Sequence, residues 1–99
     1  MENLKGSTKK YLRSLAHHLK PVVMVGRNGV SEQLIASVDA ALKDHELIKV
    51  KFLDYKEQKK EISQEIASAT KSAVVGVIGN IVTFYRPHPQ TELRKIRLP

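Results

Sequence analysis

The residues best suited to chemistry form the tetrapeptide Gly26-Arg27-Asn28-Gly29, which follows the apolar run from Pro21 to Val25. A helical pattern begins just after it, near Ser31. Two glycines at such a junction let backbone N–H groups and the Arg27 guanidinium approach a phosphate at the positive end of a helix. The Asn28 amide can bond a sugar or a phosphate. This GxxG loop therefore predicts contact with nucleic acid.

Other interpretations of the loop have to be weighed against that one. Glycines commonly mark strand-to-helix turns, so the motif alone predicts a structural turn as readily as a phosphate site. A nucleotide site is a poorer match, because the Gly-Lys-Ser/Thr sequence of a phosphate-binding loop and the G-x-G-x-x-G sequence of a dinucleotide fold are both missing. Similar GxxG loops in KH domains clamp a nucleic-acid backbone. The charge of Arg27 favours that role here.

A second candidate is a stripe of basic side chains on the first predicted helix. Lys9, Lys10, Arg13 and His17 share the face opposite the apolar residues, and Lys20 lies just beyond. A solvated helix face is the ordinary interpretation of such a stripe. Solubility faces usually interleave both signs of charge, however, and this one has no counter-charge. We therefore expect Lys9, Lys10, Arg13 and Lys20 to contact RNA.

Further positions lie on the predicted strands. Arg86 follows Tyr85 at the end of the last strand, and we include Arg86 in the candidate RNA site. Lys49 and Lys51 alternate with apolar residues and so share an open sheet face. There they either contact RNA or block pairing at the margin of the sheet. The aromatic residues, Tyr55 among them, are too few and too scattered to indicate a stacking platform.

The distribution of charge is more informative than the net value of +7. Residues 1–30 carry six Lys or Arg and one acid, residues 31–69 carry six and eight, and residues 70–99 carry five and one. Both ends are therefore basic, which suits a polyanionic partner if the fold brings the ends together. The acidic middle leaves open an alternative, a small structural component or adaptor that contacts protein partners.

Catalytic and metal-binding patterns are weak. The four histidines and the acids form no H-E-x-x-H motif, and the chain has no G-x-S-x-G motif and no cysteine. We therefore expect no enzyme activity, no metal site and no cofactor. No secretory signal is evident, and the longest apolar run, Ala73 to Ile78, is too short to span a membrane. We expect a cytoplasmic protein.

Hydrophobic periodicity predicts three helices and four strands. A helix is expected over Ser7 to Leu19 and is ended by Pro21. The remaining elements are a strand over Val22 to Val25, a helix from Ser31 to near Asp44, a strand over Leu47 to Leu53, a helix marked by Ile62, Ile66 and Ala69, and a hairpin of Val74 to Ile78 with Ile81 to Arg86. The turn Gly79-Asn80 suits positive φ. A basic tail follows over about 87–99.

This order predicts a single α/β domain, more narrowly α+β, over residues 1–99. A helix between successive strands favours parallel pairing by right-handed crossovers, and the hairpin adds an antiparallel pair. The expected fold is α-β-α-β-α-β-β, with a four-stranded mixed sheet and the helices packed on one face.

Three ordered segments carry a family resemblance. They are Leu19 to Val30, His45 to Phe52, and Val77-Ile78-Gly79 followed by Phe84-Tyr85-Arg86-Pro87. Together they resemble the CRM domain family and, more narrowly, its stand-alone bacterial members, the YhbY-like proteins. The match covers nearly the whole chain in order.

The resemblance implies an RNA-binding module, similar in fold to the C-terminal domain of bacterial translation initiation factor three. It places Gly26, Arg27, Asn28 and Gly29 against RNA. Family members are associated with large ribosomal subunit precursors in bacteria and with intron splicing in plant organelles, where longer chains carry several such domains. For one domain the resemblance favours binding of ribosomal RNA and assistance in maturation of the large subunit.

Overall fold

The computed structural model describes residues 4–99, and its element order is the expected one. The elements are α1 (Gly6–Ala16), β1 (Pro21–Val25), α2 (Glu32–His45), β2 (Leu47–Phe52), the 3-10 turn η1 (Lys56–Gln58), α3 (Lys59–Thr70), β3 (Ala73–Ile78), β4 (Ile81–Tyr85) and the 3-10 turn η2 (Thr91–Leu93). α1 ends before Leu19, because the chain tightens into a turn in which His17 N–H donates to the Ser14 carbonyl.

The four strands form one mixed sheet in the order β1-β2-β4-β3. β1 and β2 are parallel and are connected through α2, whereas β4 is antiparallel to both β2 and β3. The tight turn of the β3–β4 hairpin contains Gly79 at φ 58°, a conformation that favours glycine. The predicted mixed sheet is therefore confirmed, and β2 is one of its two central strands.

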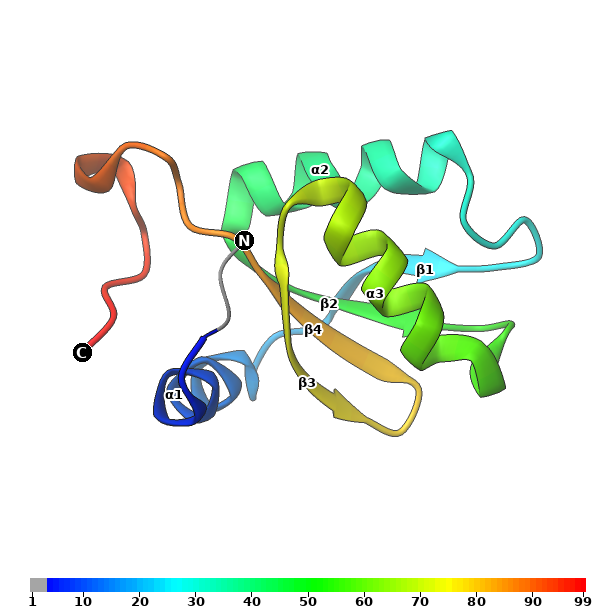
Figure 1. Ribbon diagram of the computed structural model, residues 1–99, viewed down its shortest axis with the longest axis horizontal. Coiled ribbons are helices and arrows are strands. Elements are labelled where there is room, and N and C mark those ends of the chain that lie inside the picture. Colours follow the sequence, from blue (N-terminus) through cyan, green and yellow to red (C-terminus); the bar gives the residue numbers. More distant parts are fainter. Residues whose placement is uncertain (1–3) are drawn as a thin grey trace.

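The expectation that all helices pack on one face was wrong. α2 and α3 cover one face, where Val38, Ile66, Val50 and Phe84 belong to the main core. α1 packs on the opposite face in a smaller cluster that includes Leu12, Ala16, Leu47, Val75 and Tyr85. Figure 1 shows the strands between α1 and the other two helices.

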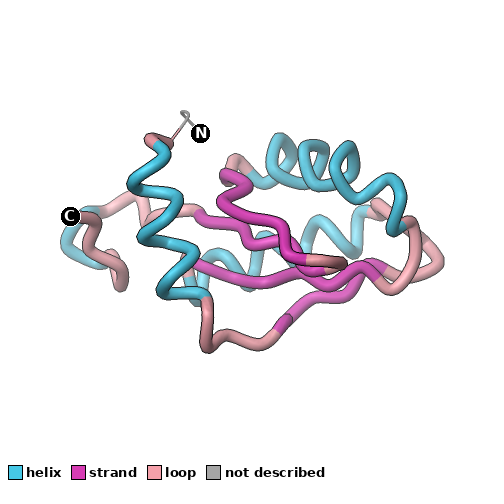
Figure 2. Tube along the Cα trace, turned by 90° about the horizontal axis from the view of Figure 1, so that it is seen from below, coloured by secondary structure: helices cyan, strands magenta, loops and turns pink. Residues whose placement is uncertain are grey.

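The reason for two cores lies in adjacent apolar residues on the strands. Side chains alternate between the two faces of a strand, so Leu47 and Ile48 face opposite sides, as do Phe84 and Tyr85. Each face therefore needs cover. α1 lies across one end of the strands (Figure 2), which leaves the rest of its face without a helix.

The segment after β4 folds back on the domain, where a buried carboxylate binds three of its backbone N–H groups. Glu46, at φ 64°, follows α2 and has a relative exposure of 2%. Its Oε2 accepts from the backbone N–H of His88 (2.9 Å), and its Oε1 accepts from those of Lys95 and Ile96 (2.9 Å each). Ile96 packs against the α1 cluster. The basic tail is thus docked along the domain.

Candidate nucleic-acid interface

The GxxG loop joins the end of β1 to the start of α2. Ser31 is the N-cap of α2, and its Oγ accepts from the backbone N–H of Leu34 at 3.0 Å. Gly29 N–H donates to the Gly26 carbonyl at 3.0 Å, which closes the loop into a turn. Arg27 and Asn28 therefore project from the tip of a short turn beside a helix N-terminus, where backbone donors and the helix dipole favour an anion.

The two glycines have different roles. Gly29 has φ 58°, and a Cβ built on it would lie 3.2 Å from the ring of Tyr55. The backbone conformation favours glycine there, and a Cβ would crowd the ring. A Cβ on Gly26 would meet nothing within 4 Å, and its φ is not in the left-handed region. The fold alone does not demand glycine at position 26, so the open backbone there is free for close approach by a ligand.

Tyr55 contacts the GxxG loop and stabilises its conformation, a role that the sequence did not predict. Its hydroxyl donates to the Arg27 carbonyl at 2.7 Å, and its ring packs against Gly29. Tyr55 itself has φ 53°, and its N–H donates to the Asp54 carboxylate at 2.9 Å. The 28-residue separation from Arg27 left no local signal for this contact. The loop is therefore braced by the segment that follows β2.

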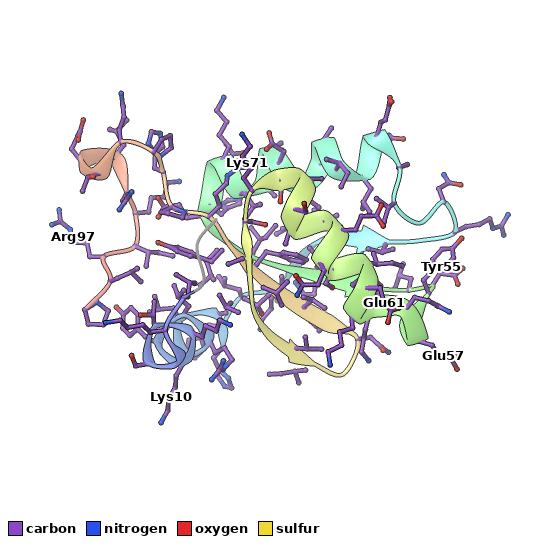
Figure 3. All side chains as sticks on the ribbon, in the orientation of Figure 1. Lys10, Tyr55, Glu57, Glu61, Lys71 and Arg97 are labelled. Atoms are coloured by element: carbon purple, nitrogen blue, oxygen red, sulfur yellow. The ribbon has the colours of Figure 1, made fainter. Side chains whose placement is uncertain are left out.

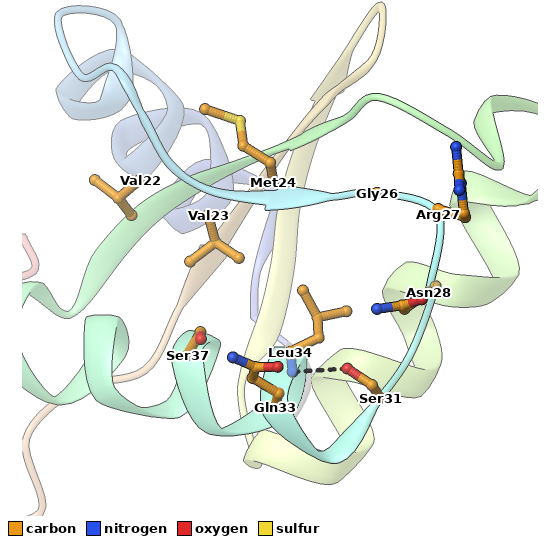
Figure 4. Close-up of a pocket in the computed structure, with 11 residues that line it drawn as sticks. Val22, Val23, Met24, Gly26, Arg27, Asn28, Ser31, Gln33, Leu34 and Ser37 are labelled. Atoms are coloured by element: carbon orange, nitrogen blue, oxygen red, sulfur yellow. Dashed lines mark hydrogen bonds between the residues drawn. The ribbon is translucent and has the colours of Figure 1, made fainter.

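A groove extends from the loop between β1 and α2. It has a volume of 350 Å³ and is lined by Val22 and Met24 on β1, by Arg27 and Asn28 in the loop, and by Gln33 and Ser37 on α2, among others. Figure 4 shows Gln33 and Ser37 on the face of α2 turned toward β1. Arg27 and Asn28 are exposed, and among residues 4–99 Arg27 takes part in no ion pair. The groove thus offers amide, hydroxyl and guanidinium groups beside an open strand edge.

The basic stripe lies at the other end of β1 from the loop (Figure 1). Lys10 and Lys20 are exposed, Lys9 is half-buried, and Lys10 points away from the domain (Figure 3). Arg13 is engaged within the fold, because its Nη1 donates to the Val75 carbonyl at 2.9 Å and its stem covers Gly76. The stripe and the loop therefore do not form one compact patch.

Lys49 and Lys51 lie on the face that α1 covers only in part. Lys51 pairs with Met24 on β1, and Lys49 pairs with Thr83 on β4. Since β2 has neighbours on both sides, the interpretation that these lysines block pairing at a sheet margin was wrong. Their positive charge lies between the stripe on α1 and the strand that leads to the loop.

Arg86 lies away from the loop and links three elements. Its Nη1 donates to Asp39 Oδ1 at 2.6 Å and to the Thr70 carbonyl at 2.8 Å, while its Nη2 donates to the Asp39 carbonyl at 3.1 Å. Its neighbour Tyr85 is buried under α1, and burial, together with the nearby Glu46 carboxylate, raises the pKa of Tyr85. The structure therefore does not bring Arg86 together with Arg27.

Residues 4–99 contain no group of three or more His, Cys, Asp or Glu side chains placed to hold a metal ion. No helix within that range is both long enough and apolar enough to cross a membrane.

Comparisons with known proteins confirm the resemblance seen in the sequence. Residues 4–86 match the model of the CRS1 / YhbY (CRM) domain. A Haemophilus influenzae protein named "RNA-binding protein" is 46% identical over 100 residues, which cover 100% of this chain and 98% of the relative. "Probable RNA-binding protein YqeI" of Bacillus subtilis is 37% identical over 97 residues, with 97% and 99% covered.

A solved structure confirms the fold. The solution structure of the hypothetical protein SAV1595 from Staphylococcus aureus matches with a TM-score of 0.82 and 39% sequence identity. The match covers 98% of this chain and 100% of that one.

Proposed function

Because this chain belongs to the CRS1/YhbY (CRM) domain family, we propose that it binds RNA through the GxxG loop and the adjoining groove. Two relatives that match almost all of the chain carry RNA-binding names. We propose further that in the cell it binds ribosomal RNA in precursors of the large ribosomal subunit and assists their maturation in the cytoplasm.

The observation that carries the proposal is the pairing of an exposed Arg27 with an open backbone at Gly26, beside the N-terminus of α2. A phosphate at this point meets unpaired backbone donors, the positive end of the helix dipole and a guanidinium. Because Tyr55 already fixes the loop, little conformational entropy is lost when RNA binds.

The exposed lysines outside the loop support the same function at longer range. Lys10, Lys20 and Lys51 are exposed and attract a polyanion without reading its bases. We infer that they orient RNA on the domain, while the loop makes the close contact. In this proposal the protein acts by binding RNA alone, without catalysis or cofactor.

Two of the eight acids in residues 31–69 do not support the adaptor alternative. Asp39 is paired with Arg86, and Glu46 holds the backbone of the C-terminal segment. Both acids therefore serve contacts within the chain. A structural ribosome component remains a distinct outcome of the experiment below.

The test is the sedimentation of the protein in its host on sucrose gradients. We expect it with immature large subunits and only sparsely on translating ribosomes, with release at high salt because phosphate contacts supply much of the affinity. Cells lacking it should accumulate large-subunit precursors, most strongly in the cold. Equal occupancy of immature and mature subunits would indicate a resident component, and absence from both would remove the ribosome from the proposal.

A further inference from the structure

A second cavity lies at the end of β1 away from the loop. It has a volume of 390 Å³ and is formed where the end of α1, the start of β1 and the end of α2 meet the C-terminal segment. Its rim carries Leu15, Leu19 and Val22, which remain 38%, 39% and 53% exposed. Three large apolar side chains are therefore partly exposed around one opening.

This cavity and the groove of the loop meet at one residue of β1. Val22 lines both of them. Figure 4 shows Val22 on β1 at the end away from Arg27. Gly26 is four positions after Val22 along the chain, a distance of about 13 Å at roughly 3.3 Å per residue. A single strand of RNA held at the loop and running along β1 therefore reaches the cavity.

The chemistry of the walls selects for an apolar group attached to an anion. Leucine, valine and isoleucine side chains make up most of the lining, and among residues 4–99 its only ionisable side chains are those of Lys20 and His45, with no acid. An unpaired nucleobase has apolar faces and hangs from a phosphodiester, and bases taken out of a stack are commonly held between apolar side chains. The volume lies in the range of about 300–1,000 Å³ that is typical of small-molecule pockets.

The C-terminal segment supplies one wall of the cavity. Ile96 lines it, and the Ile96 backbone N–H is held by the buried Glu46 carboxylate at 2.9 Å. The cavity is therefore formed by fixed elements, with Leu47 and Ile48 buried at its base.

We propose that this cavity is a binding site for one unpaired nucleobase of the RNA strand whose backbone contacts the GxxG loop. This inference rests on the proposed function, because the loop supplies the backbone contact. It adds a preference for single-stranded RNA over duplex, since a paired base cannot enter the cavity.

The experiment compares two fluorescent RNA probes by anisotropy at low salt. One is a uridine oligomer of about 12 nucleotides, a length within the site sizes of small single-strand-binding folds. The other has the same sugar-phosphate backbone without bases. Leu19→Ser and Leu15→Gln alter the rim at exposed positions, and Ile78→Ser is the matched control, because Ile78 is 77% exposed on β3 at the far margin of the sheet. Thermal melting verifies the fold of each variant.

We expect the unaltered protein to bind the uridine oligomer about fivefold more tightly than the abasic one, a factor that burial of a few tens of Å² of apolar surface supplies. Leu19→Ser and Leu15→Gln should each reduce that preference and leave abasic binding unchanged, whereas Ile78→Ser should preserve it. Equal binding of both probes by the unaltered protein would overturn the base site and leave loop binding intact. The base site would also be overturned if Leu19→Ser and Leu15→Gln kept the preference for the uridine oligomer. That result is expected if the cavity receives a protein side chain. Failure to bind either probe would overturn the proposed function as well.

Discussion

The GxxG loop and the segment from Arg86 to Arg97 are both basic, but they use their cations differently. Arg27 stands exposed beside a helix N-terminus, and the protein contacts the loop through its backbone, by way of Tyr55. In the C-terminal segment, Arg86 binds Asp39 and two carbonyls, and Lys95 Nζ donates to the Asp44 carbonyl. The loop leaves the Arg27 guanidinium exposed, whereas the C-terminal segment uses Arg86 and Lys95 in contacts within the fold.

A surplus of basic residues therefore does not by itself locate a binding surface. Arg94 shows this again, because its Nε donates to the His88 carbonyl at 2.8 Å. By contrast, Arg97 is exposed and extends outward (Figure 3). The comparison makes opposite predictions for the two regions. Changes in the C-terminal segment should reduce stability more than RNA affinity, and changes at the loop tip should do the reverse.

The largest effect is expected at Glu46. Glu46→Ala removes the acceptor for the N–H groups of His88, Lys95 and Ile96, and should lower the free energy of unfolding by about 3 kcal/mol, because unpaired groups in partly buried positions are costly. Thermal melting measures the loss, with Glu92→Ala on the exposed side of the same segment as the control. An unchanged melting temperature would mean that Glu46 does not stabilise the C-terminal segment. Binding of abasic RNA at the loop should persist in the folded variant.

Gly29→Val should have the second-largest effect and should lower both the stability and the RNA affinity. A β-branched residue at φ 58° is strained, and its Cβ would lie 3.2 Å from the Tyr55 ring. We expect a stability loss of about 2 kcal/mol, within the range for such strained backbone positions, together with weaker RNA binding. Gly26→Ala is the matched control and should melt normally. If Gly29→Val kept full stability and affinity, the loop conformation described above would be wrong.

Arg86→Gln should reduce stability by about 1–2 kcal/mol, because charge-assisted bonds to Asp39 and Thr70 are lost. RNA affinity should change by less than about twofold, since one distant surface charge contributes little at moderate salt. Urea unfolding and RNA titration of the same sample test both statements. A large loss of affinity with normal stability would restore Arg86 to the RNA site that the sequence suggested.

Tyr55→Phe should have a small effect on stability. It removes one hydrogen bond to the Arg27 carbonyl and keeps the ring against Gly29, so the expected loss is about 1 kcal/mol or less. RNA affinity should fall by about threefold, because a loop without this hydrogen bond is less restrained and loses more conformational entropy when RNA binds. Denaturant unfolding and RNA titration measure the two effects. Identical affinity in the variant would mean that the hydroxyl does not position the loop.

The elements and the mixed sheet could be predicted from the sequence because each strand and helix has a clear local period. The alternation of Ile48, Val50 and Phe52 with Lys49 and Lys51 correctly indicated one covered face. The position of α1 could not be found from its own periodicity. It depends on adjacent apolar residues such as Phe84 and Tyr85, which face opposite sides of the sheet. Both faces therefore need a helix to cover them.

The candidate site was predictable only where it is local. The GxxG loop is continuous in sequence, so its glycines, Arg27 and Asn28 could be named directly. The brace by Tyr55 and the capture of Arg86 by Asp39 join residues 28 and 47 positions apart. Such contacts depend on how β1, α2 and β4 are placed together in space, which no local pattern records.

The most direct measurement of the central claim is the RNA affinity of Arg27→Glu as a function of salt, made alongside its melting temperature. We expect about a tenfold loss of affinity at low salt, a salt slope smaller in magnitude by about 1, and an unchanged melting temperature, because the contact proposed for Arg27 is with phosphate and Arg27 takes part in no ion pair within residues 4–99. If RNA affinity and its salt slope are the same as in the unaltered protein, the GxxG loop is not the RNA-binding site.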